Sequence, residues 1–113
     1  MNPKRPGKKA PQLLSPEAFP GLRSFFRGYF HQDMKEEYGS AQEAANEFWN
    51  DSSSEEQNAI IEEWSRFLDH TQGQPLETIN KIVTGPLGSS YSLSAEDIDS
   101  LSSIFKRPAR RNL

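Results

Sequence analysis

A succession of helix start signals, each followed by apolar residues at three- and four-residue spacing, is the sequence feature that most constrains the fold. Ser40 and Glu43 stand at the spacing of a capping box, in which the two side chains satisfy each other's backbone donors. Further starts stand at residues 53–56, at Pro75 and at residues 94–97, and a cap at 15–17 leads into a predicted helix from Leu22 to Tyr29. The glycine and proline at 85–86 end the helix that Pro75 begins.

Patterns typical of β-strands are nearly absent, because valine, isoleucine and threonine do not alternate with polar residues over any useful length. The predicted fold is therefore all-α, a small bundle of about five to six short helices in a single domain. A chain of 113 residues is long enough to bury one core. We expect this core to be rich in aromatic side chains, namely Phe19, Phe25, Phe26, Phe30, Phe48, Trp49, Trp64, Phe67 and Phe105.

Charge divides the chain into an acidic body and two basic ends. Residues 19–105 carry fifteen Asp and Glu against five Lys and Arg, whereas residues 1–14 and 107–113 are basic and contain almost no core-forming side chain. We expect a disordered basic arm at 1–14, a helical domain at 15–106 and a disordered basic tail at 107–113. An acidic body repels nucleic acid and attracts basic proteins, so a protein partner is expected and a nucleic acid is not.

Composition also disfavours several locations for the protein. The chain has no cysteine, which fits a reducing compartment. No apolar run reaches the roughly 20 residues that a membrane span needs, so no membrane association is expected. The basic N-terminus is followed by no apolar stretch of signal-peptide length. These features together predict a cytoplasmic protein.

His31 and Asp33 are the residues that most resemble part of a catalytic or metal site. The other histidine, His70, lies at the far end of another predicted helix, and no serine stands in a nucleophile motif. We therefore expect no enzyme activity, no metal and no cofactor. Instead we expect His31 and Asp33 to cap helix ends and to tie the connecting loop to the backbone, and we expect Asp33 to accept backbone donors in the turn towards Tyr38.

Acidic residues concentrate on two consecutive predicted helices. Glu43, Glu47 and Asp51 are four residues apart and so line one helix face. The candidate partner-binding set continues on the next helix with Glu55, Glu62, Glu63 and Asp69. A solvated face and a surface that docks a basic partner both fit this pattern. The three tyrosines, each next to a turn, likewise fit either simple packing or anchors of an interface.

Short motifs between residues 19 and 50 carry a family resemblance. In chain order they are Phe19-Pro20-Gly21-Leu22, then Tyr29-Phe30-His31-Gln32-Asp33, then Tyr38-Gly39-Ser40 followed by Glu43-Ala44. They resemble the opening of an all-helical family of immunity proteins from bacterial contact-dependent growth inhibition systems. Within this opening we expect a structural role for Tyr29, His31, Asp33, Tyr38 and Ser40.

The resemblance implies a non-catalytic protein that is made beside a secreted toxin, binds the toxin's C-terminal domain in the cytoplasm and protects the producing cell. Many such toxin domains are nucleases with basic substrate clefts, so a nuclease is the expected partner, and an acidic inhibitor would steer association. The helical opening leaves the toxin's chemistry open. The alternative is a helical adaptor or regulator that binds another basic protein, and a third possibility is a small enzyme that uses His31 and Asp33.

Overall fold

Six α-helices and no strand make up the part of the chain that the computed structural model describes, residues 18–106. This result confirms the predicted all-α fold. The helices are α2 (Pro20–Tyr29), α3 (Met34–Tyr38), α4 (Ala41–Asp51), α5 (Ser54–Thr71), α6 (Leu76–Thr84) and α7 (Ala95–Ile104). The expected start at 15–17, the basic arm at 1–14 and the basic tail at 107–113 lie outside the described residues.

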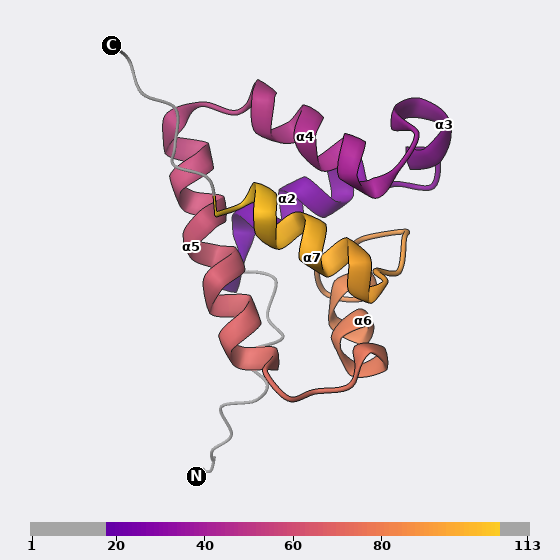
Figure 1. Cartoon of the computed structure of the whole chain (residues 1–113), viewed down its shortest axis with the longest axis vertical. Helices are drawn as coiled ribbons and strands as arrows, with labels where there is room; N and C mark the ends of the chain where they lie inside the picture. The colour runs from indigo at the N-terminus through magenta and orange to yellow at the C-terminus, as the bar shows by residue number, and fades with distance from the viewer. Residues whose placement is uncertain (1–17, 107–113) are drawn as a thin grey trace, which may run out of the picture.

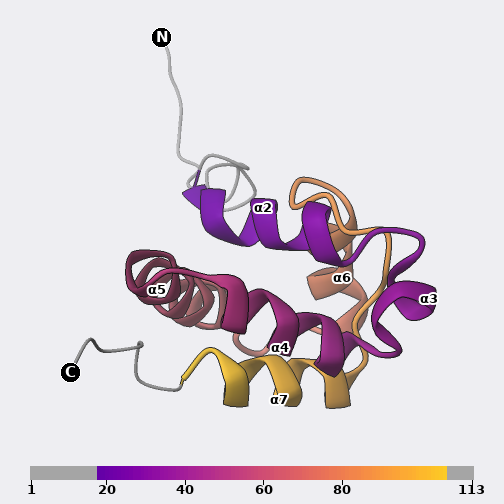
Figure 2. The same cartoon turned by 90° about the horizontal axis from the view of Figure 1, so that it is seen from above.

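The helices are arranged in layers, with α4 and α5 between α2 on one side and α7 on the other (Figure 2). Helix α2 packs on α5 and α4, α7 packs on α4, and the short α3 packs on the start of α4. Helices α4 and α5 meet at a steep corner, and the loop after the far end of α5 leads into α6, which turns back towards α7 (Figure 1). Within residues 18–106, no helix combines the length and the apolar character that crossing a membrane requires.

The helix starts largely follow the predicted capping pattern. Complete capping boxes form between Ser53 and Glu56 and between Ser94 and Asp97. At α4 the structure forms one half of the expected box, in which the Ser40 hydroxyl accepts the Glu43 amide at 3.1 Å. A cap hydrogen bond contributes about 0.5–2 kcal/mol, so these starts fix the helix boundaries locally.

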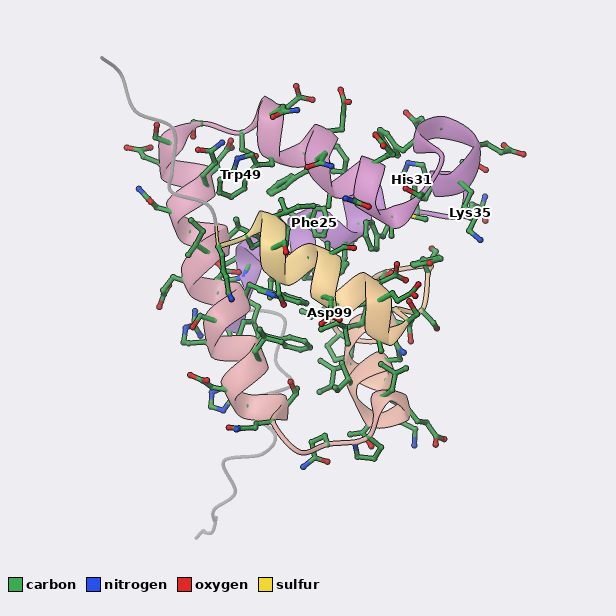
Figure 3. The ribbon with its side chains drawn as sticks, in the orientation of Figure 1. Phe25, His31, Lys35, Trp49 and Asp99 are labelled. Carbon is green, nitrogen blue, oxygen red and sulfur yellow. The ribbon has the colours of Figure 1, made fainter. Side chains whose placement is uncertain are left out.

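Aromatic side chains fill the core, as the sequence predicts. Eight of the nine expected aromatic residues are buried, and Phe48 is half-buried at the edge of the cluster. The Phe25 ring, at the centre of the molecule in Figure 3, lies 4.8 Å from the Phe48 ring and 5.3 Å from the Phe105 ring. The Phe105 ring also lies 5.9 Å from the Trp64 ring. These contacts join α2, α4, α5 and the end of α7 into one core.

Helix α3 occupies a segment that the sequence suggested was a turn. It forms because Met34 is buried and because Gly39 ends it with a φ of +98°, a conformation that glycine adopts without steric cost. The prediction that the Asp33 side chain accepts backbone donors is wrong, since this residue stands at the N-cap without a side-chain capping bond. The loop is tied instead by His31, whose Nδ1 accepts the Asp33 amide at 3.1 Å.

Candidate protein-docking surface

Glu43, Glu47 and Asp51 form an exposed line of carboxylates along α4, here named the α4 stripe. They share one face because residues four apart lie above one another on a helix. The opposite face of α4 is buried through small side chains and Trp49, which Figure 3 shows near the corner with α5. Among residues 18–106, the ion pairs are His31 with Glu37 and Arg66 with Glu62, so neither includes the α4 stripe.

Two tyrosines border the α4 stripe, and they are named here the tyrosine pair. The rings of Tyr29 and Tyr38 stack with their centroids 5.6 Å apart and an interplanar angle of 25°. The edge-to-face partner of Tyr29 is Phe48 on α4, at 5.5 Å. Phe48 follows Glu47 directly and stands one turn before Asp51, so the α4 stripe runs alongside the tyrosine pair.

The pKa values of Tyr29 and Tyr38 are both raised, in part by carboxylates of the α4 stripe. Burial is the main cause that raises the pKa of Tyr29, followed by the negative charge of Asp51 and by smaller effects that include Glu47. Burial also leads for Tyr38, whose pKa is raised further by the charges of Glu37, Glu47 and Asp51. A nearby carboxylate disfavours the phenolate, so both hydroxyls remain protonated and face a negative field.

His31 and Ser40, which belong to the same sequence motif as the tyrosine pair, lie at the junction of α2, α3 and α4. The His31 Nε2 atom lies 3.1 Å from Glu37 Oε1 on α3, and its ring lies 6.2 Å from the Tyr38 ring. Figure 3 shows His31 beside α3, at the opposite end of α4 from Trp49. Because Ser40 caps α4, the motif joins three helices through local contacts.

Glu55, Glu62 and Asp69 form a second exposed line, seven residues apart on α5, named the α5 stripe. Its middle member is paired, since Arg66 Nε lies 3.1 Å from Glu62 Oε2. The Arg66 guanidinium also donates to the Ala18 carbonyl at 3.2 Å. The structure therefore brings the α4 stripe to the tyrosine pair, whereas the α5 stripe is partly neutralised by its own helix.

Glu63 does not belong to either stripe, although the sequence placed it in the candidate partner-binding set. Its side chain is 6% exposed and its two carboxylate oxygens accept the Gly21 amide at 3.1 Å and the Leu22 amide at 2.9 Å. The buried carboxylate therefore caps the start of α2 from α5. The signal was present in the spacing, because Glu63 stands three residues after Ile60 and four before Phe67 on the apolar face.

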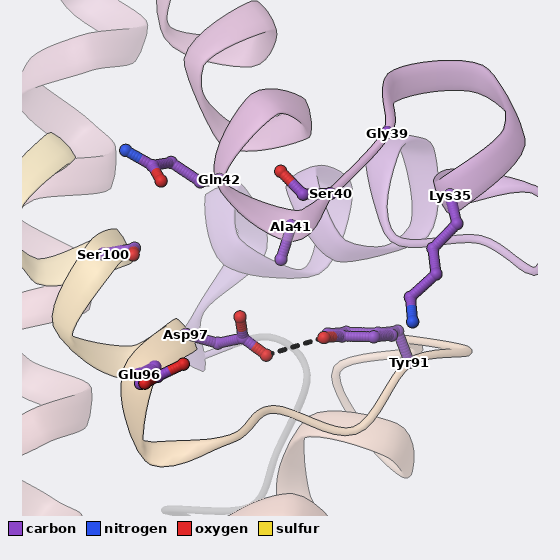
Figure 4. Close-up of a pocket in the computed structure, with 9 residues that line it drawn as sticks. All are labelled: Lys35, Gly39, Ser40, Ala41, Gln42, Tyr91, Glu96, Asp97 and Ser100. Atoms are coloured by element: carbon purple, nitrogen blue, oxygen red, sulfur yellow. Dashed lines mark hydrogen bonds between the residues drawn. The ribbon is translucent and has the colours of Figure 1, made fainter.

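A hollow of 340 Å³ lies between the start of α4 and the start of α7, lined in part by Ser40 and Gln42 (Figure 4). Across it the Tyr91 hydroxyl donates to Asp97 Oδ2 at 2.8 Å. The Lys35 amine lies 5.9 Å from the centre of the Tyr91 ring. Burial, the hydrogen bond to Asp97 and the Asp97 charge raise the pKa of Tyr91 to about 12, so this tyrosine is a neutral donor and no general base.

The described residues offer little for metal or acid–base chemistry. No group of three or more His, Asp or Glu side chains within residues 18–106 is arranged to hold a metal ion. His31, one of the two residues considered for catalysis, pairs with Glu37 through Nε2 and accepts the backbone amide of Asp33 through Nδ1, so its ring serves the helix junction. The α4 stripe and the tyrosine pair are the exposed grouping of candidate residues that the structure brings together.

A family model described as CdiI immunity protein matches residues 18–92. The matched range contains α2 to α6, and so it includes the tyrosine pair and both acidic stripes. Comparisons with curated proteins and with solved structures gave no match.

Proposed function

The chain belongs to the CdiI immunity protein family, and we propose that it binds and neutralises the C-terminal toxin domain of a contact-dependent growth inhibition system. The family supports a role as an immunity protein. Our proposal adds the partner, a toxin domain with a basic surface, and the place of action, the cytoplasm of the producing cell. It also adds the mode of action, which is occlusion by binding and not turnover.

The α4 stripe is the observation that carries this proposal. Three exposed carboxylates lie in a line on one rigid helix, and no lysine or arginine among residues 18–106 forms an ion pair with them. Unpaired carboxylates on a helix produce a directed negative field that accelerates association with a basic partner. A nuclease fits best, because its substrate cleft is basic and an acidic inhibitor imitates the charge of the nucleic acid.

The test is protection of cells that produce the toxin domain encoded beside this chain. We expect growth in the presence of the wild-type chain and a stoichiometric complex in the lysate. The variant Glu47→Lys with Asp51→Lys should bind more weakly, since each lost charge pair costs on the order of 1 kcal/mol. Both positions lie beyond the first turn of α4, so the positive charges should leave the helix start intact.

A matched control carries the same change of net charge on other helices. Glu77→Lys with Asp99→Lys alters exposed residues on α6 and α7, and Figure 3 shows Asp99 on α7. Because Glu77 lies in the first turn of α6, where a positive charge is unfavourable, a melting curve checks that this control remains folded. We expect this control to protect cells as well as the wild type. Equal protection by both double variants would show that the α4 stripe is not the docking surface. A wild-type chain that captures a different basic protein and gives no protection would favour the adaptor function.

A further inference from the structure

Three aromatic rings form a stack that runs from the core to the surface beside the α4 stripe. The Phe25 ring is fully buried, the Tyr29 ring stacks on it at 6.1 Å, and the Tyr38 ring stacks on Tyr29 at 5.6 Å. Tyr29 and Tyr38 are half-buried. Because the buried ring and Phe48 hold Tyr29 in place, Tyr38 is presented as a rigid outer ring.

We propose that Tyr38, together with Glu47 and Asp51, receives an arginine side chain of the toxin domain. This inference rests on the proposed function and names the chemistry of the contact. A guanidinium is flat, stacks on aromatic faces and bonds carboxylates through two parallel N–H groups. An ammonium is a compact point charge, so it would use the carboxylates but gain less from the ring.

The chain contains the same combination elsewhere in its own fold. The Arg66 guanidinium carbon lies 5.0 Å from the centre of the Phe19 ring, and its Nε lies 3.1 Å from Glu62 Oε2. In this molecule a guanidinium is therefore held by an aromatic ring, a carboxylate one turn away on its own helix and the Ala18 carbonyl. At the α4 stripe the ring and the carboxylates are present, and residues 18–106 supply no arginine or lysine that pairs with them.

Two basic side chains close in sequence to the tyrosine pair contact another part of the fold, which favours a partner as the source of the arginine at the α4 stripe. Arg27, on the same helix as Tyr29, contacts Gly88 through the stem of its side chain, because a Cβ at Gly88 would lie 2.5 Å from Arg27 Cγ. Lys35, on the same helix as Tyr38, lies over Tyr91. Each of these nearby cations therefore contacts the segment that links α6 and α7.

The first experiment measures the dissociation constant of the complex between the toxin domain and the full chain, for the wild type and four variants. Tyr38→Phe keeps the ring and should bind within about threefold of the wild type, whereas Tyr38→Leu removes it and should bind about tenfold more weakly. Glu47→Gln with Asp51→Asn keeps the shape of the surface and should also weaken binding. Combining Tyr38→Leu with the two amides should cost less than the sum of the separate effects, because all three residues contact one group.

Melting curves of the same variants show whether a loss of binding reflects unfolding. If Tyr38→Leu melts at a clearly lower temperature than the wild type, the inference is tested instead with the amide variant and with an arginine-to-lysine scan of the toxin. In that scan, substitution at one position should weaken binding about tenfold. Wild-type binding that is unchanged by the leucine and amide variants would overturn the inference and leave the proposed function standing.

The second experiment does not need the toxin. A tetra-arginine peptide should shift the ring resonances of Tyr29 and Tyr38 in the spectrum of the full chain, and a tetra-lysine peptide at equal concentration should shift them less. The amide resonance of Asp99 on α7 serves as the control position. Equal shifts with both peptides would show attraction by charge alone and would overturn the assignment to arginine, whether or not the chain neutralises a toxin.

Discussion

Removal of the Glu63 carboxylate should destabilise the protein far more than removal of its neighbour Glu62. Glu63 reaches from α5 to the first turn of α2, where each of its oxygens accepts one backbone amide. The substitution Glu63→Ala leaves the amides of Gly21 and Leu22 without this acceptor. The Leu22 bond is buried, so water cannot easily replace it.

The magnitude follows from the two bonds and their setting. A hydrogen bond to a charged group contributes about 1.5–3 kcal/mol, and the positive end of a helix adds up to about 2 kcal/mol when the carboxylate is partly buried. Burial of the carboxylate opposes these gains through lost hydration. We therefore expect Glu63→Ala to lower the free energy of unfolding by about 2–4 kcal/mol.

Two matched variants make the measurement decisive. Glu63→Gln has one acceptor oxygen for two amides and should lose about half as much, while Glu62→Ala removes a surface pair with Arg66 and should cost about 0.3–0.5 kcal/mol. In thermal denaturation, Glu63→Ala should melt about 10–25 °C below the wild type. A midpoint for Glu63→Ala equal to that of Glu62→Ala would refute the capping role.

Two further predictions concern groups whose roles the structure defines. Asp33→Ala should change the free energy of unfolding by less than about 0.5 kcal/mol, because the side chain makes no capping bond, and a larger loss in denaturant titration would contradict this geometry. The pKa of Tyr91 is raised from 10.0 to about 12, so its stabilising effect is complete below pH 10 and is lost as the pH rises through about 12. Tyr91→Phe should therefore lose less stability than the wild type over this alkaline range, as unfolding curves and tyrosinate absorbance would show.

Helix starts were predictable from sequence because a cap is a local interaction. Ser53 and Ser94 bond to residues three positions further on, and α5 and α7 start there as the sequence predicts. Helix α3 was missed because it has five residues and no side-chain cap, so it depends on burial of Met34 and on the left-handed Gly39. Such tertiary causes leave no periodic pattern in a short segment.

The candidate surface was predictable in its residue types but not in its arrangement. The four-residue spacing of Glu43, Glu47 and Asp51 correctly places them on one exposed face. Their position beside Tyr29 and Tyr38 depends on the angle between α2 and α4, which no local pattern encodes. Misplacing Glu63 had another cause, since its charge suggested the surface while its spacing indicated the core.

Helix α7 lies outside the matched range of the family model, yet it belongs to the same packing unit. The match ends at residue 92, whereas α7 begins at Ala95 and packs on α4. Phe105 at its end is 1% exposed and contacts Phe25, Trp49 and Trp64. Without this helix those rings would lose their cover on the side away from α2, and α4 would lose the support that positions its acidic stripe. The matched segment therefore depends for its shape on a helix that lies outside the match.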